Sequence, residues 1–274
     1  MTEIGTEYTS EILLDAIEEY RPSSVWALFS GGSDSLTTTH LVSKLVPDFK
    51  VAHVNTGIGI KATREFVIRT CKQYGWPLTV FKTPESYEDL IAKHGFPGPR
   101  MHNKMYNRLK DRCIEQLVRD NKRQTRDRSK RFDRILLVTG IRQDESKKRM
   151  GYVNAVNRRG AQVWCNAIFD WSSDKKERYI ADNNLETNPV SGILGYSGEC
   201  LCGAYAVGSN GSTERHLIDT FFPEEAMELK RLEGVAAKNG HFWKWHEMPP
   251  KFVKEIRVGQ SYMPMCFNCL TKTG

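Results

Sequence analysis

The sequence lacks three features that would each have pointed to a familiar class of protein. No apolar run approaches the roughly 18 residues that span a bilayer, so we expect no transmembrane helix and no membrane partner. Residues 1–7 are polar and acidic, unlike a secretory leader, so we expect a cytoplasmic protein. No lysine follows the glycines at positions 31 and 32, which excludes the Walker loop.

The charge balance and the cysteine count narrow the class further. The 274 residues carry a formal charge of +7 with a pI near 9.0, which favours a polyanionic substrate or partner. Seven cysteines in a reducing compartment favour free thiols or a metal site over disulfides. The length allows one large domain, or one domain with a small appendage.

A serine- and glycine-rich loop is the most informative segment. It follows an apolar run at residues 25–29 and precedes a segment with helical spacing at residues 36–45. Glycines let the backbone approach an anion, and the first amides of the helix point into the loop. An ordinary turn that caps a helix is the alternative. The loop consists of Ser30, Gly31, Gly32, Ser33, Asp34 and Ser35.

Alternating strands and helices in the first half predict an α/β fold, a doubly wound parallel sheet with helices on both faces. We expect strands at residues 25–29, 49–54, 78–81 and 134–140, and helices at residues 10–20, 36–45, 63–74 and 106–118. Three polar segments lie at the ends of expected strands, and we expect them to converge at one edge of the sheet. Their sequences are SGGSDS, VNTGIGI and TGIRQDES. The pattern changes after about residue 150, although helices are expected at residues 175–183 and 223–238. We therefore predict a nucleotide-binding domain over residues 1–190 and a cysteine-bearing extension over residues 191–274.

Four ordered segments of the chain resemble motifs of the PAPS reductase superfamily. The SGGSDS loop looks like the family's pyrophosphate loop, and VNTGI at residues 54–58 resembles its V-D-T-G-I segment, with Asn55 in place of Asp. Residues 140–149 are similar to G-x-R-x-x-E-S-x-x-R, and residues 168–189 resemble a later tract with D-W and N-P. The resemblance spans residues 25–203 and implies an adenine nucleotide α-hydrolase-like fold.

The resemblance also implies a site for ATP and Mg²⁺. Arginine forks suit phosphate oxygens, which independently supports Arg142 and Arg149 as polyphosphate ligands. Catalytic roles are implied for Asp34, Arg142, Glu145 and Arg149. Nucleotide contacts are implied for the six loop residues above and for Asn55, Thr56, Gly57, Gly140 and Arg142.

Two close cysteine pairs suggest a four-thiolate centre. Cys200 and Cys202 form one pair, and Cys266 and Cys269 form the other. Four thiolates bind either Zn²⁺ or a [4Fe–4S] cluster, and buried free cysteines are the alternative. The resemblance favours the [4Fe–4S] cluster. We expect the remaining cysteines at positions 71, 113 and 165 to be inert core residues.

A basic stretch from Arg119 to Arg134 (RDNKRQTRDRSKRFDR) has no apolar periodicity. It is either a solvated loop or a contact surface for a nucleic-acid backbone. We expect it to lie near the nucleotide site and to present a polymer to that site.

Three functions remain open. The first is an ATP-dependent enzyme that cleaves the α–β bond of ATP, carries the cluster and transfers sulfur to nucleic acid. A sulfur-donor protein and an oligomeric state are both compatible with this function. The second is a sulfonucleotide (PAPS or APS) reductase that produces sulfite. The E-C-G-[IL]-H context of the nucleophilic cysteine in those reductases is absent from this sequence, which favours the first. The third is a non-catalytic nucleic-acid-binding module.

Overall fold

The computed structural model describes residues 8–122, 133–143 and 154–250. The chain forms two compact units that are each assembled from separate stretches. The first unit consists of residues 1–53, 65–81 and 114–188, and the second consists of residues 54–64, 82–113 and 189–274. The sequence prediction instead placed a single boundary after residue 190. It did not anticipate that two stretches from the first half of the chain belong with the C-terminal part.

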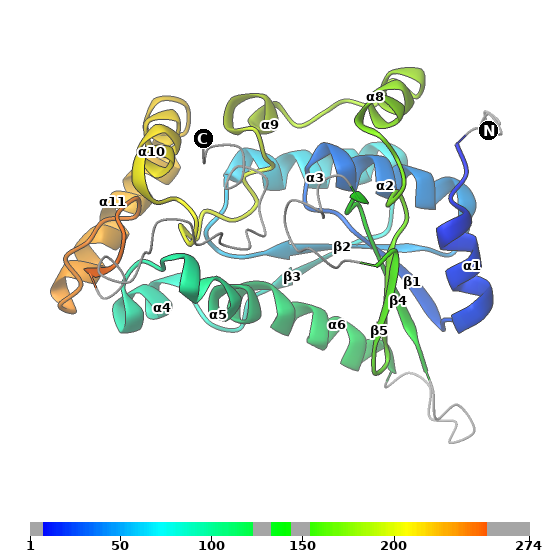
Figure 1. Ribbon diagram of the computed structural model, residues 1–274, viewed down its shortest axis with the longest axis horizontal. Coiled ribbons are helices and arrows are strands. Elements are labelled where there is room, and N and C mark those ends of the chain that lie inside the picture. The colour runs from blue at the N-terminus through cyan, green and yellow to red at the C-terminus, as the bar shows by residue number, and fades with distance from the viewer. Residues whose placement is uncertain (1–7, 123–132, 144–153, 251–274) are drawn as a thin grey trace. The chain divides into compact units, whose positions relative to one another are not determined.

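A six-stranded sheet with the order β3-β2-β1-β4-β6-β5 forms the centre of the first unit (Figure 1). Strand β1 pairs in parallel with β2 and with β4, and β4 pairs in parallel with β6. The edge strand β5 is antiparallel to β6. The strands are β1 (Ser24–Leu28), β2 (Lys50–Asn55), β3 (Leu78–Lys82), β4 (Ile135–Thr139), β5 (Val156–Arg159) and β6 (Gln162–Asn166).

Helices cover both faces of this sheet, as the alternating pattern predicted. Figure 1 shows α2 and α3 on one side of the sheet and α6 on the other. Helix α2 packs on β1 and β4 and contacts α8, while α1 packs on β6. The helices are α1 (Glu11–Tyr20), α2 (Ser33–Leu45), α3 (Lys61–Tyr74), α6 (Arg112–Lys122) and α8 (Ser173–Asp182).

The core of the first unit explains why these segments form a sheet. Strand β4 has the sequence ILLVT, and its first four residues are fully buried, as expected for a central parallel strand. Aromatic side chains complete the core on the side of α2, where Phe29 makes edge contacts with Phe66 and Trp76. Cys71 and Cys165 are buried here, and burial raises the pKa of each to about 12, which supports their prediction as inert core residues.

The second unit is mainly helical and has its own core. Helix α11 packs against α4 and α10, and α10 also contacts α9. Cys113 is buried in this part of the chain, and burial raises the pKa of its thiol to about 11. The helices are α4 (Tyr87–His94), α5 (His102–Tyr106), α9 (Pro189–Leu194), α10 (Gly208–Phe221) and α11 (Pro223–Lys238), with a 3₁₀ turn at Pro99–Met101 and a π-helical turn at Asn107–Asp111.

The basic stretch falls mostly outside the described residues, at positions 123–132, so its expected position near the nucleotide site stays a prediction. Its described ends lie where the strands of the sheet begin, because the stretch leads from the end of α6 into the start of β4. The backbone amide of Ser23, just before β1, donates to the carbonyl of Arg134, just before β4, at 2.8 Å. The SGGSDS loop follows the other end of β1. In a parallel sheet, a loop that enters a strand and a loop that leaves it lie at opposite edges.

No helix in the described ranges is long and apolar enough to cross a membrane.

Candidate nucleotide-binding site

The SGGSDS loop has the backbone geometry of an anion cradle. Gly31 has φ +84°, a left-handed conformation that glycine adopts without strain. Gly32 is the N-cap of α2, and no side chain caps the first amides of this helix. The Ser35 hydroxyl donates to the carbonyl of Gly32 at 2.9 Å and accepts from the amide of Ser30 at 3.3 Å. The loop is therefore held by its own hydrogen bonds, while the helix N-terminus is not occupied by a capping side chain.

The end of β4 approaches this loop so closely that only glycine fits at position 140. A Cβ atom on Gly140 would lie 2.6 Å from both the carbonyl carbon and oxygen of Asp34. The chain passes from β1 to β2 and β3 on one side and returns to β4 on the other side of β1. The loop therefore lies at the topological switch point of the sheet, where ligands of open α/β sheets bind.

Two cations converge on Asp34 at the start of α2. The guanidinium of Arg142 donates from Nε to Asp34 Oδ1 at 2.9 Å and from Nη1 to the hydroxyl of Ser173 at 3.1 Å. The ammonium of Lys176, on α8, lies 3.5 Å from the same carboxylate oxygen and donates to the hydroxyl of Ser33 at 3.2 Å. The side chains of Arg142 and Lys176 are 5% and 9% exposed, whereas that of Asp34 is 25% exposed.

This cluster has the chemistry of a polyphosphate site. Lys176 also pairs with the carboxylate of the exposed Glu177 at 3.1 Å, so two nearly buried cations face Asp34 and one exposed carboxylate, and the helix N-terminus adds partial positive charge. Magnesium is usually held by one or two carboxylates together with phosphate oxygens of the substrate, and Asp34 fits that role as the carboxylate of this cluster. The predicted convergence of SGGSDS with TGIR is thus confirmed by the contact between Asp34 and Arg142.

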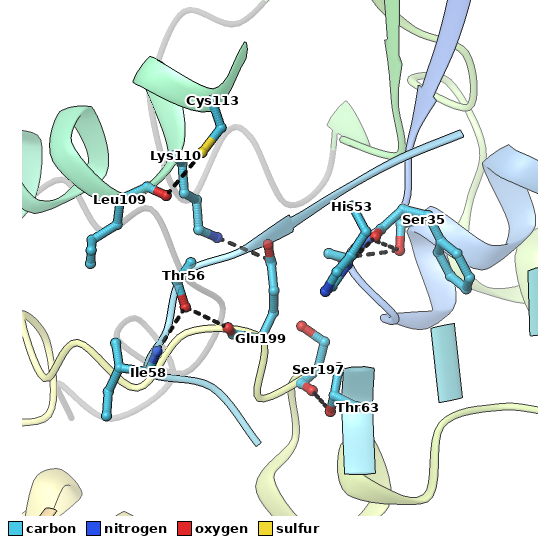
Figure 2. Close-up of polar contacts among 12 residues, drawn as sticks. Ser35, His53, Thr56, Ile58, Thr63, Leu109, Lys110, Cys113, Ser197 and Glu199 are labelled. Carbon is cyan, nitrogen blue, oxygen red and sulfur yellow. Dashed lines mark hydrogen bonds and ion pairs between the residues drawn. The ribbon is translucent and has the colours of Figure 1, made fainter. Parts of the chain in front are cut away.

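The second predicted nucleotide segment belongs to the second unit and is fixed there by main-chain contacts. The hydroxyl of Thr56 donates to the carbonyl of Glu199 at 3.0 Å, so it is engaged within the protein (Figure 2). The side chain of Asn55 accepts from the amide of Gly57 at 3.0 Å and thereby shapes the turn. Main-chain bonds from Ile60 to Gly198 and from Leu201 to Ile58 complete the pairing of the two segments.

A cavity of about 310 Å³ opens beside Asn55 in the second unit. Its volume is at the lower end of the range for small-ligand sites. Asn55 and Gly57 line it, as the resemblance implied for nucleotide contacts, although the occupant stays a prediction. The remaining lining residues are Ile58, Lys82, Thr83, Ser86, Tyr87, Glu88, Glu228, Arg231 and Leu232.

The described part of the cysteine centre contains Cys200 and Cys202. Both are half-buried free thiols in the second unit. The hydrogen bond from Cys202 and the positive charge of Lys110 lower the pKa of Cys200 to about 7, although burial opposes them. Lys110 also forms an ion pair with Glu199 at 3.0 Å, and Figure 2 shows its ammonium directed at that carboxylate. This pair outweighs the effect of burial and raises the pKa of Lys110.

Several predicted residues lie outside the described ranges. These are Glu145 and Arg149 of the arginine motif and Cys266 and Cys269 of the second cysteine pair. Within the described ranges, no group of three or more potential metal ligands occurs. Two thiols alone do not complete a four-thiolate centre, so the cluster stays a prediction.

The sequence analysis missed two residues of the cluster around Asp34 and the lysine that pairs with Glu199. Lys176 and Ser173 lie on α8, next to the Asp-Trp segment that the resemblance had identified. A lysine four residues after the N-cap serine, Ser172, resembles any exposed helix residue in the sequence, so only its 9% exposure distinguishes it. Lys110 lies in a π-helical turn for which the sequence gives no periodic signal.

Comparison with known proteins decides the family. The family model described as "Phosphoadenosine phosphosulfate reductase domain" matches residues 24–192, which is more than half of the chain. The chain belongs to this family. The PAPS reductase resemblance of its motifs is thereby confirmed, and the family acts on adenine nucleotides.

The individual relatives that match this chain are only distantly similar to it. An uncharacterized protein of Methanocaldococcus jannaschii is 28% identical over 237 residues, covering 84% of this chain and 53% of that protein. The chain therefore spans about half the length of this relative. The phosphoadenosine 5'-phosphosulfate reductase of Synechocystis is 24% identical over 189 residues, which cover 69% of this chain and 72% of that enzyme.

A solved structure supports the fold assignment. The crystal structure of phosphoadenylyl-sulfate (PAPS) reductase from Candida auris, in a phosphate complex, matches with a TM-score of 0.50 at 16% identity. The match covers 67% of this chain and 83% of that chain. At this identity the likeness shows the fold alone, and it agrees with the predicted adenine nucleotide α-hydrolase-like architecture.

Proposed function

We propose that this protein binds ATP and Mg²⁺ at the SGGSDS loop and cleaves the α–β phosphate bond. The proposed reaction serves sulfur transfer to a nucleic acid. A [4Fe–4S] cluster held by Cys200, Cys202, Cys266 and Cys269 is part of this proposal, as is a sulfur-donor protein.

The observation that carries the proposal is the arrangement of Asp34 between Arg142 and Lys176 at the uncapped start of α2. Two nearly buried cations beside Asp34 at a helix N-terminus suit a chain of phosphates, which brings several negative charges to one place. A lone sulfate or carboxylate needs fewer positive groups. The fixed positions of both cations also mean that no large rearrangement is needed on binding.

In the proposed reaction, an oxygen of the acceptor attacks the α phosphorus and pyrophosphate leaves with the electron pair of the broken bond. Adenylyl transfer of this kind depends on positioning and on charge neutralisation rather than on a protein nucleophile. Arg142 and Lys176 are suited to neutralise the charge that develops on the leaving pyrophosphate. Asp34 is the residue that would hold Mg²⁺, and the metal would supply further neutralisation of the phosphate charge.

Reduction of a sulfonucleotide is the second candidate. It is favoured by the similarity of this chain to the phosphoadenosine 5'-phosphosulfate reductase of Synechocystis. The same loop and cations would then hold the phosphosulfate group. The identity of 24% leaves the substrate of this chain open, so the two candidates require a direct comparison.

Product analysis separates these candidates. The protein, purified without oxygen, is incubated with Mg²⁺ and either ³²P-labelled ATP or ³⁵S-labelled PAPS, in the latter case with a dithiol reductant. No acceptor is present in this assay, so water takes its place in the attack on the α phosphorus, and we expect AMP and pyrophosphate in equal amounts from ATP and no sulfite from PAPS. Sulfite release without ATP cleavage would establish the reductase reading instead, and turnover of neither substrate would favour the non-catalytic nucleic-acid-binding module.

A further inference from the structure

An open groove of about 360 Å³ lies between α6 and the start of β6 in the first unit. We call it the amino-edge groove, because β6 begins here beside the first residue of β4. Gln162 pairs with Ile135 on one side and with Arg159 of β5 on the other. The lining residues are Glu115, Val118, Arg119, Lys122 and Gln162.

Basic side chains from two separate elements surround this groove. Arg119 and Lys122 come from the last turns of α6. Arg159 comes from the edge strand β5, where it is exposed and directly opposite Gln162, so the two side chains lie on the same face of the sheet. Two cations, Arg119 and Lys122, therefore line the groove with one carboxylate, that of Glu115, and Arg159 lies beside Gln162.

Arg119 at the groove is only weakly paired with a carboxylate of the protein. Arg119 has an acidic neighbour, Asp120, but their closest atoms are 3.9 Å apart and both side chains are at least half exposed, so this pair contributes little. The oxygen of the Gln162 side chain accepts from the indole of Trp164 at 3.0 Å. The amide nitrogen of Gln162 is left as a hydrogen-bond donor on the groove wall.

We propose that the amino-edge groove binds the phosphate backbone of a nucleic acid. A nucleic-acid backbone presents closely spaced phosphates, which match separate cations along a groove, and such contacts give affinity without reading sequence. An acidic protein surface is the competing partner. It is disfavoured because the groove contains only Val118 as an apolar contact, and protein interfaces need a desolvated apolar centre.

The position of the groove sets a length requirement, which rests on the proposed function. The groove lies where the strands begin, whereas the SGGSDS loop follows the far end of β1. The five residues of β1 span about 17 Å at roughly 3.3 Å per residue, which equals about five base pairs of duplex. A nucleic acid held at the groove therefore has to extend at least that far to bring an acceptor atom to the loop.

The test measures how binding depends on salt. Fluorescein-labelled DNA of about 20 base pairs and RNA of about 20 nucleotides are each titrated with the protein, and binding is followed by anisotropy at KCl concentrations from about 50 to about 200 mM. The variant combines Arg119→Gln, Lys122→Gln and Arg159→Gln. The control combines Lys72→Gln, Lys230→Gln and Lys238→Gln, which removes the same charge from exposed lysines of α3 and α11.

We expect the slope of log K against log salt to be smaller for the groove variant by about 2.7 on duplex DNA and about 2 on RNA, at 0.9 and 0.7 per lost contact. The control should differ from the parent by much less. Equal slopes for the two triple variants would overturn the proposal, as would displacement of the oligonucleotide by excess ATP, or no binding at the lowest salt.

The same preparations separate this inference from the proposed function. ATP cleavage without an acceptor should be unchanged in the groove variant, because none of its three residues belongs to the cluster around Asp34. If the parent cleaves no ATP but the slopes differ as expected, the nucleic-acid surface stands and the proposed reaction fails.

Discussion

Replacement of Gly140 by alanine tests the contact between β4 and the SGGSDS loop. The new Cβ atom would lie 2.6 Å from two backbone atoms of Asp34 and 3.0 Å from the amide of Ser35. These neighbours are backbone, so relief requires that the end of β4 or the start of α2 moves. Overpacking of this kind costs about 1–3 kcal/mol.

The matched control is Gly234→Ala in α11, where no atom lies within 4 Å of the new Cβ atom. Alanine in a helix interior is favoured over glycine by about 0.5–1 kcal/mol. The two variants should therefore differ by about 1.5–4 kcal/mol in the free energy of unfolding, measured by urea denaturation followed by tryptophan fluorescence.

The Gly140→Ala variant should also bind ATP more weakly, by about ten- to a hundredfold, because a small displacement of the helix start misplaces the phosphates. The Gly234→Ala variant should bind ATP as the parent does. If both variants unfold at the same urea concentration and bind ATP equally, the close approach of β4 to the loop is not a feature of the protein and the argument for the cluster is lost.

Three further changes have defined outcomes. Asp34→Ala should abolish Mg²⁺-dependent pyrophosphate release, and unchanged metal-dependent turnover would contradict the role of this residue. The variant should also lower the free energy of unfolding by about 2–4 kcal/mol, because it leaves the nearly buried Arg142 without its carboxylate partner. Burial lowers the pKa of His40 to about 4, as it does for His102, so the unfolded chain binds a proton at His40 that the folded protein excludes, and the contribution of His40 to stability should fall by about 2 kcal/mol from pH 7 to pH 5. Urea denaturation at both pH values should show a smaller pH dependence for His40→Gln, whereas the exposed His216→Gln should behave as the parent. Protein purified without oxygen from iron-replete cells should contain iron and acid-labile sulfide, and stoichiometric zinc without sulfide would contradict the cluster.

The regular elements of the first unit could be predicted from sequence, because apolar periodicity and strand length identify them. Helix α2 begins at Ser33 rather than at the predicted residue 36, since its first turn consists of polar loop residues that carry no apolar signal. Strands β5 and β6 were both missed; the sequence of β5, VNRR, is largely exposed and alternates no apolar residues. Helix α10 was missed because its first turns, with the sequence GSNGST, contain only small or polar residues and carry no apolar periodicity.

The candidate site could be predicted only where a motif marks the chain. Asp34 and Arg142 were identified because glycine and arginine motifs at strand ends have a known physical use. Lys176 was not, since its contact with Asp34 depends on how α8 packs against α2, which is a tertiary property. The edge of the sheet at which the basic stretch begins could not be predicted for the same reason, because it follows from the pairing of β1 with β4 rather than from the composition of the stretch.

The most direct test of the central claim is the affinity for ATP and inorganic pyrophosphate of three single variants. Arg142→Gln and Lys176→Gln each remove one cation from the cluster, and Arg178→Gln removes an exposed cation from the same helix as Lys176. A hydrogen bond to a charged group contributes about 1.5–3 kcal/mol, so calorimetric titration should show about ten- to a hundredfold weaker binding of both ligands for the first two variants. Arg178→Gln should bind as the parent does. Equal affinities for all three variants would contradict the assignment of this cluster as the polyphosphate site.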